Sequence, residues 1–221
     1  MEHANPRRMT LGLAAILAAA LFASSSHAAL ITFDTLVSGQ TSFGYDGDGD
    51  AINDVIFSTA DPFGFNTAGP GPNMSFIDEP GIEGTSLLNP DLRVDFLNGA
   101  VNTLSFGFAV NASFEAPANG VTFSVFNAAN QLLGSQSVQA LFTATGSGTS
   151  NFPEGRVTLS FAGVASYALF DFVSPSRYIV DNFEGTFGST EDITPTVPEP
   201  MSLALAILGI ATTWRSRRWR R

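Results

Sequence analysis

Apolar residues recur at every second position in several short runs between residues 29 and 190. The clearest of these runs are residues 31–33, 104–110, 121–125 and 157–161. A period of two places alternate side chains on opposite faces of a β-strand, so one face can be buried while the other meets water. No long stretch of this region has the period of an amphipathic helix. The sequence therefore predicts an all-β domain.

Clusters of glycine, proline and asparagine separate these runs and are typical of turns. They are residues 68–73, 79–81, 98–99, 119–120, 146–148 and 153–155. About eight short strands at this spacing indicate an antiparallel two-sheet sandwich with a jelly-roll-like path. Most of the 20 phenylalanines lie on these strands. They could form a platform for sugars, but at this density we expect them to fill the space between the two sheets.

The N-terminus has the three parts of a secretory signal peptide. Arg7 and Arg8 give it a positive charge, residues 11–23 are apolar, and small residues stand at the two positions that determine cleavage. We expect residues 1–28 to be removed by signal peptidase between Ala28 and Ala29. The paired arginines also allow the twin-arginine export route as an alternative to the general one. A retained transmembrane helix is the less favoured alternative, because the apolar run is shorter than the roughly 20 residues of a full span.

The C-terminus combines a proline-rich stop, an uncharged apolar run and a cluster of arginines. Val197, Pro198, Glu199 and Pro200 precede the apolar residues 201–214. The chain then ends in Arg215, Arg217, Arg218, Arg220 and Arg221. This order resembles the PEP-CTERM sorting signal of bacterial exported proteins. The resemblance implies that residues 198–221 form a sorting signal with a transmembrane helix and a cytoplasmic arginine-rich tail, and that an exosortase-type enzyme processes it.

The apolar run of this tail is also shorter than a usual span of about 20 residues. Arginine stems can reach the membrane surface from within, and Trp214 and Trp219 suit the headgroup region, so a short span is feasible. The alternative is a buried helix of a globular domain.

The remaining chain divides into a β-sandwich domain, residues 29–187, and a polar, proline-bearing linker, residues 188–197. Residues 29–198 hold 18 of the 20 acidic residues but only three of the ten basic residues, so they carry a net charge of −15. Such a surface repels nucleic acid and anionic lipid and attracts cations. The chain has no cysteine, which excludes disulfides and a lipid-bearing cysteine.

The exported region also lacks histidine and lysine, since His3 and His27 both lie in the signal peptide. Together with the absence of cysteine, these absences exclude histidine-based triads, thiol nucleophiles, Schiff-base chemistry and histidine-ligated zinc or iron. Paired carboxylates could still serve a glycosidase, but no pair is marked by its spacing. We therefore expect no catalytic residues and a protein that is not an enzyme.

One acidic segment has the spacing of a calcium loop. Asp46, Asp48 and Asp50 alternate with glycines, and Asp54 follows four residues later. Calcium takes six to eight oxygen ligands in a flexible loop. The spacing resembles the calcium loops of thrombospondin type 3 repeats and dockerins at all four positions, which implies that these aspartates bind a calcium cofactor.

Two residues depart from the related EF-hand loop. Ala51 stands where glycine is usual, and Phe57 stands where a bidentate glutamate is usual. We therefore expect an open, weak calcium site, with an acidic surface turn that binds no metal as the alternative.

The first and last predicted strands carry acids near their ends, Asp34 and Asp181. Many jelly-roll binding modules open and close with similar strands, which pair with each other and whose acids can hold a structural metal. This resemblance implies that the two strands are adjacent and that residues 31–187 form one complete domain.

Three classes of function agree with these observations. The first is a non-catalytic exported protein, anchored in the cell envelope or released into an exopolysaccharide matrix, whose acidic sandwich binds glycans or matrix proteins. The second is a carbohydrate-active enzyme that uses paired carboxylates, and the third is a purely structural matrix protein. For the first we expect contact with the membrane through the C-terminal helix and with extracellular polysaccharide, and none with nucleic acid.

Overall fold

The computed structural model contains ten strands and no helix in the part of the chain that it describes. The residues described are 26–67, 69, 74–78, 80–112, 117–143, 152–173 and 175–188. All of them belong to the first of two compact units, residues 1–190, and the second unit is residues 191–221. Every strand pair is antiparallel, so the prediction of an all-β antiparallel domain is confirmed for these residues.

The described residues include no helix long and apolar enough to cross a membrane. The helix expected over residues 201–214, the linker after residue 188 and the signal peptide up to residue 25 lie outside the described residues. The predicted turns at residues 70–73 and 146–148 also lie outside them.

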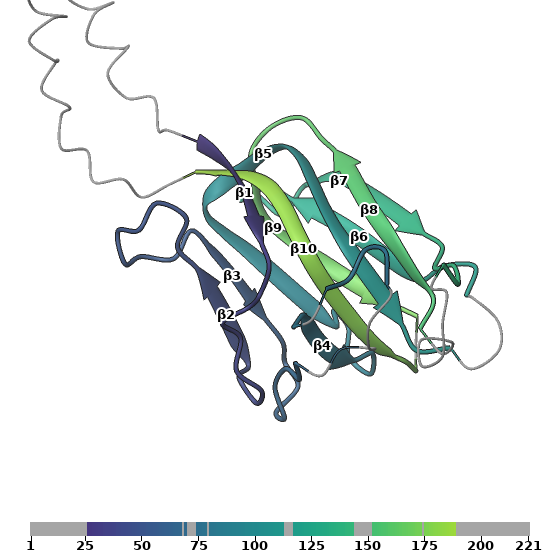
Figure 1. Cartoon of the computed structure of the whole chain (residues 1–221). Helices are drawn as coiled ribbons and strands as arrows, with labels where there is room; N and C mark the ends of the chain where they lie inside the picture. Colours follow the sequence, from purple (N-terminus) through teal and green to yellow (C-terminus); the bar gives the residue numbers. More distant parts are fainter. Residues whose placement is uncertain are drawn as a thin grey trace, which may run out of the picture. The chain divides into compact units, whose positions relative to one another are not determined.

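The strands form one hydrogen-bonded sheet (Figure 1). They are β1 (Ser26–Ile31), β2 (Ser42–Tyr45), β3 (Val55–Ser58), β4 (Ile82–Thr85), β5 (Leu92–Val110), β6 (Val121–Phe126), β7 (Leu132–Val138), β8 (Glu154–Ser160), β9 (Ala165–Phe172) and β10 (Arg177–Gly188). The order along its main path is β1-β10-β5-β9-β6-β7. Beside it, β2 pairs with β3, β3 and β8 pair with β5, and β4 pairs with β10.

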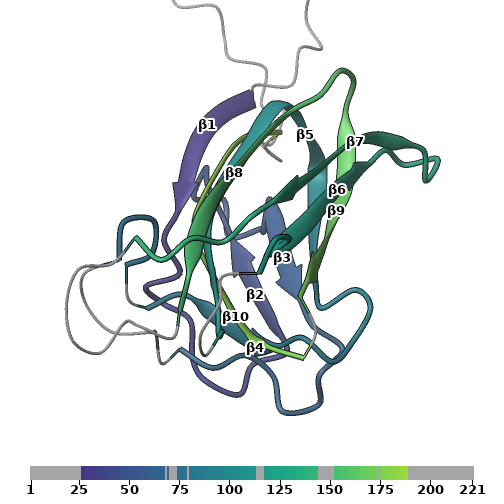
Figure 2. The same ribbon diagram turned by 90° about the vertical axis from the view of Figure 1, so that its right-hand side faces the viewer.

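The long strand β5 belongs to both layers of the sandwich. Its first residues, 92–96, pair with β3 and β9, whereas residues 100–110 pair with β10 and residues 103–109 with β8. Figure 2 shows β1, β8 and β10 on one side of the molecule and β6 and β9 on the other. The chain therefore passes from one layer into the other within a single strand.

The predicted turn at Asn98 and Gly99 is wrong, because both residues lie inside β5. Gly99 does have the left-handed backbone of a turn, with φ of 85°, and Asn102 follows with φ of 68°. The bend shifts the register with β9 between Asp95 and Ala100 but does not end the strand, because each side of it finds its own partner strands. The cluster at residues 153–155 likewise starts a strand, since β8 begins at Glu154.

Phenylalanine rings fill the space between the two layers. Phe106 of β5 lies 5.0 Å from Phe123 of β6 and 4.9 Å from Phe170 of β9, measured between ring centroids. Edge-on and tilted contacts at this distance are the preferred geometries of aromatic pairs. The prediction that phenylalanines form the core is confirmed for those that are buried: Phe33, Phe43, Phe57, Phe65, Phe96, Phe106, Phe108, Phe123, Phe170, Phe172, Phe183 and Phe187.

The first and last strands are neighbours, as expected. β1 pairs along its whole length with β10, with Ser26 opposite Gly188 and Ile31 opposite Phe183. Because the last strand also pairs with β5, it links the N-terminal edge of the sheet to its centre.

The segment of residues 74–78 approaches the outer face of the layer formed by β8, β5 and β10. A Cβ atom at Gly107 of β5 would collide with the carbonyl oxygen of Phe76, so this close approach requires glycine. Buried carboxylates fasten the segment at both ends. Glu154 accepts hydrogen bonds from the N–H groups of Ser75 and Phe76, and Asp181 accepts one from the N–H of Asp78.

Candidate metal centre

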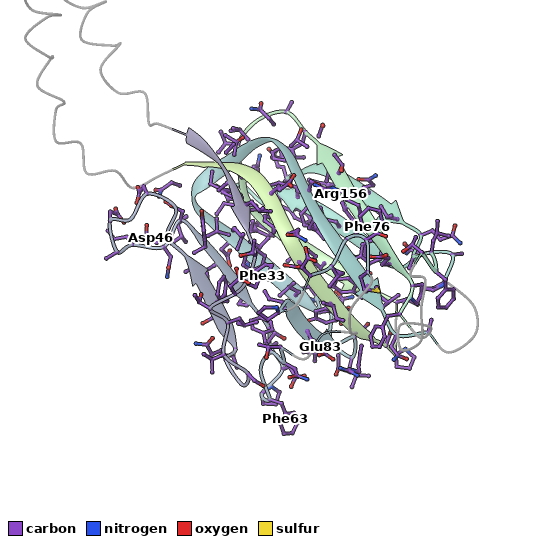
Figure 3. All side chains as sticks on the ribbon, in the orientation of Figure 1. Phe33, Asp46, Phe63, Phe76, Glu83 and Arg156 are labelled. Carbon is purple, nitrogen blue, oxygen red and sulfur yellow. The ribbon has the colours of Figure 1, made fainter. Side chains whose placement is uncertain are left out.

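Residues 46–54 connect β2 to β3 and form the acidic loop. The two strands pair up to Tyr45 and Val55, and the N–H of Asp54 donates to the carbonyl of Tyr45 at 2.8 Å, which closes the base of the loop. Figure 3 places Asp46 on this loop, which projects beyond the two strands. The loop is therefore local in sequence, and its conformation is anchored by a hairpin.

Three of the four predicted calcium ligands come together. Asp46, Asp48 and Asp50 each offer a carboxylate oxygen, and these oxygens lie within 4.8 Å of one another. Asp54 does not belong to this group; it lies at the base of the loop and is 1% exposed. Its charge nevertheless affects the pKa of a member of the group, Asp48. Burial, and then the charges of Asp50 and Asp54, raise the pKa of Asp48 above its ordinary value, against a hydrogen bond from the N–H of Asp50.

The carboxylates of the loop also accept hydrogen bonds from its backbone. The N–H donors are Gly49 and Ala51 to Asp46, Asp50 to Asp48, Ile52 to Asp50, and Gly47 to Asp54. Burial alone would raise the pKa of Asp46, but its bonds from Gly49 and Ala51 hold that pKa below the ordinary value. Such bonds are what an acidic turn without metal would use.

These backbone bonds do not satisfy the whole loop. Oδ2 of Asp48 and Oδ1 of Asp54 are buried and have no hydrogen-bond partner among the described residues. A carboxylate oxygen that has left water without gaining a partner is destabilising. A cation would supply the missing partner and would reduce the repulsion between the carboxylates. An all-oxygen, all-carboxylate set suits a hard cation such as calcium or magnesium.

The two departures from the EF-hand pattern have structural consequences. Ala51 has a left-handed backbone with φ of 71°, the conformation for which glycine is favoured, at a cost of about 1–2 kcal/mol. Phe57 lies in β3 with its ring fully buried in the core, next to Phe183. No side chain at that position can therefore close the site, which leaves the loop open on one side.

Four acids outside the loop are buried: Glu83, Asp91, Glu154 and Asp181. Of these, the sequence distinguished only Asp181. Burial raises the pKa of Asp181 to about 6; hydrogen bonds from the N–H groups of Asp78 and Asn182 oppose this, and the charges of Asp78 and Asp34 add to it. Asp34 and Asp181 therefore interact by charge. Among the described residues they belong to no group of three or more acids close enough to share a metal ion.

The predicted signal-peptide cleavage site lies inside β1. Ala28 is opposite Thr186 of β10, and Ala29 is opposite Gly185. A chain that begins at Ala29 would retain the three pairs from Ala29 to Ile31. The predicted sorting residues lie outside the described residues, so their role stays a prediction: Val197, Pro198, Glu199, Pro200, Arg215, Arg217 and Arg218.

No protein-family model matches the chain, and no curated protein matches its sequence. Solved structures similar to it include the K3 cleaved adhesin domain of Lys-gingipain from Porphyromonas gingivalis, which is 18% identical over 73% of this chain and 99% of that chain, with a TM-score of 0.39.

Two other similar structures are carbohydrate-binding modules. The CBM27-1 module of Caldicellulosiruptor saccharolyticus, in complex with mannohexaose, is 12% identical over 72% of this chain and 97% of that chain, with a TM-score of 0.39. The CBM22-1 xylan-binding domain of Paenibacillus barcinonensis Xyn10C is 11% identical over 76% of this chain and 98% of that chain, with a TM-score of 0.34. At these TM-scores the likeness carries no inference about the function of this chain.

Proposed function

We propose that this protein is an exported, non-catalytic β-sandwich whose β2–β3 loop binds calcium and whose C-terminal signal sorts it to the cell envelope or the exopolysaccharide matrix. There the sandwich binds glycans or matrix proteins. The observation that carries the proposal is the loop, in which three carboxylates lie within 4.8 Å of one another beside two buried carboxylate oxygens without partners.

Calcium binding at this loop stabilises the edge of the sandwich. Among the described strands, β2 is hydrogen-bonded only to β3, and each of the two contributes a buried ring to the core, Phe43 and Phe57. A cation held between the carboxylates of the connecting loop opposes the separation of the two strands. Extracellular calcium modules work with dissociation constants of about 0.1–1 mM, which suits an open site such as this one.

A non-catalytic role is supported by the way the buried acids are used. Glu154 and Asp181 accept hydrogen bonds from the segment of residues 74–78, and Asp91 accepts them from the N–H groups of Leu88 and Phe172. A carboxylate occupied by backbone donors holds the fold together and is poorly placed to act as an acid or a base.

Export and sorting are supported by the sequence of the two ends. A signal peptide up to Ala28 directs the chain to the membrane, and the Pro198-Glu199-Pro200 triplet with its apolar run and arginines holds it there for processing. In this proposal an exosortase-type enzyme then decides whether the sandwich stays in the envelope or enters the matrix.

Isothermal titration of the metal-free, full-length chain with calcium tests the loop directly. We expect one site with a dissociation constant on the order of 1 mM. The Asp48→Asn variant keeps the shape of the side chain and should lose most of this affinity, because a neutral amide replaces one charged ligand. The matched variant Asp171→Asn removes one exposed acid of β9 and should bind calcium as the unaltered chain does. Equal binding by all three proteins would contradict the proposed site.

A further inference from the structure

A hollow of about 240 Å³ lies beside β4, on the part of the sandwich where residues 61–66 pass this strand. Asp61, Phe63, Glu83 and Arg177 are among the residues that line it. None of them belongs to the acidic loop, and no pattern in the sequence groups them.

Phe63 is held out of the core by an ordered turn. It is 87% exposed, more than any other large hydrophobic residue in the described ranges, whereas Phe65 is buried. Asp61 shapes the turn, since its Oδ1 accepts the N–H of Phe63 at 2.9 Å and its carbonyl accepts the N–H of Gly64 at 3.0 Å. Gly64 has φ of 71° and no room for a side chain against the carbonyl of Gln40. Figure 3 shows the Phe63 ring pointing away from the sandwich.

An aromatic ring presented in this way is available to a ligand. The turn is fixed at its far end by Phe65, whose N–H donates to the carbonyl of Gln40 at 2.7 Å. The backbone that carries the ring is therefore ordered before any ligand arrives, which reduces the entropy lost on binding. Exposed apolar surface on an ordered scaffold is typical of a binding site.

Glu83 provides an unused acceptor in the same hollow. It is 2% exposed, and its backbone exchanges two hydrogen bonds with Asn66, at 2.8 and 2.9 Å. Its Oε1 forms an ion pair with Nη2 of Arg177, while its Oε2 is buried without a hydrogen-bond partner among the described residues. Arg177 is about half exposed and lies 5.6 Å from the centre of the Phe152 ring, so its remaining donors are open to a ligand.

The charges and shapes of these groups indicate the ligand class. Two carboxylates against one guanidinium give the hollow a net negative charge, within a domain that is itself strongly acidic, so an anionic ligand is disfavoured. The free acceptor on Glu83 requires a donor, and the guanidinium requires an acceptor. A sugar hydroxyl is both a donor and an acceptor. A pyranose ring also has an apolar face that packs on an aromatic ring.

We propose that this hollow binds one sugar residue of a neutral polysaccharide. The apolar face of the sugar lies on Phe63, one hydroxyl donates to Oε2 of Glu83, and a neighbouring hydroxyl oxygen accepts from Arg177. The inference rests on the glycan-binding part of the proposed function and assigns that binding to a site.

The test uses the full-length chain in a polyoxyethylene detergent, whose headgroup contains no sugar. The probes are neutral hexaoses of glucose, mannose, galactose and xylose, together with oligomers of uronic acids of the same length. We expect binding to at least one neutral hexaose and weaker binding to the uronic acid oligomers. Phe63→Ala should weaken the neutral interaction about tenfold or more. Phe63→Trp should retain or strengthen it, because the larger ring offers more surface.

Two further variants complete the design. Glu83→Gln removes the charged acceptor and should also weaken binding about tenfold. Phe142→Ala truncates another exposed phenylalanine, 43% exposed and absent from this hollow, and should leave binding unchanged. Thermal unfolding of each variant separates lost binding from lost folding. If Glu83→Gln does not fold, Phe63→Ala decides the test, because Phe63 is at the surface and its truncation leaves the core intact.

The outcomes distinguish this site from the function on which it rests. If the unaltered chain binds a neutral hexaose and Phe63→Ala binds it equally well, the glycan function stands and the assigned site is wrong. If the unaltered chain binds neither the neutral hexaoses nor the uronic acid oligomers, both the site and the glycan function fail, whatever calcium does at the β2–β3 loop. Preference for uronic acids overturns the assigned ligand class. Cleavage of the bound hexaose would overturn the non-catalytic role.

Discussion

The buried carboxyl group of Asp181 makes the stability of the sandwich depend on pH. Burial raises its pKa from the ordinary value of 3.8 to about 6. Because the folded state binds this proton more tightly than the unfolded state, lowering the pH through 6 favours folding. The gain levels off near pH 4, where the unfolded chain also takes up the proton. Between pH 7 and pH 5 the expected increase in the free energy of unfolding from this one group is about 1 kcal/mol.

Thermal unfolding at pH 7 and at pH 5 measures this increase. For a domain of this size it corresponds to a rise in Tm of roughly 2–4 °C. Burial also raises the pKa of Asp91, which acts in the same direction. The informative quantity is therefore the difference between the unaltered chain and Asp181→Asn.

In Asp181→Asn the amide mimics the protonated acid and does not titrate, so the pH-dependent gain should shrink by about 1 kcal/mol. Asp171→Asn, a change at an exposed acid of β9, should keep nearly all of the pH dependence of the unaltered chain, because the charge of Asp171 makes only a minor contribution to the raised pKa of Asp91. An unchanged pH dependence in Asp181→Asn would mean that Asp181 titrates with an ordinary pKa in the folded state and that its burial does not make stability depend on pH.

Three further variants or conditions test other parts of the structure. If calcium binds with a dissociation constant near 1 mM, about 10 mM calcium should add roughly 1.4 kcal/mol to the free energy of unfolding and raise Tm by about 3–6 °C. Magnesium should raise Tm much less. Asp48→Ala should abolish most of the rise caused by calcium. Gly107→Ala should lower stability by about 2–4 kcal/mol in urea unfolding, because the new methyl group displaces the backbone of Phe76. Gly134→Ala should change it little, because the nearest atom, 3.3 Å away, is the end of the flexible Leu159 side chain. Ala51→Gly should raise the stability of the calcium-free chain by about 0.5–1 kcal/mol, since glycine relieves the left-handed backbone; an unchanged or lower urea midpoint would contradict this.

The parts of the fold that depend on local pattern could be predicted from the sequence. The alternation at Val121, Phe123 and Val125 predicts β6 because side chains one residue apart point to opposite faces of any strand. The acidic loop was predictable for the same reason, since Asp46, Asp48 and Asp50 are close in space because they are close in sequence.

The features that depend on distant partners could not be predicted. Asn98 and Gly99 have the composition of a turn, and only the four partner strands of β5 decide that the chain bends without ending the strand. Glu154 is buried because Ser75 and Phe76, far away in sequence, donate their N–H groups to it. Phe63 and Phe65 have strand-like spacing, but the left-handed Gly64 between them sends one ring outward.

Mass spectrometry of envelope and extracellular fractions tests whether the sandwich is exported and sorted by its C-terminal signal. The protein should begin at Ala29 and lack Arg215–Arg221, because signal peptidase and the exosortase-type enzyme remove the two ends. A variant with alanine substitutions at Pro198, Glu199 and Pro200 should keep its arginine tail. Recovery of only the full-length chain, in the cytoplasm, would contradict the account.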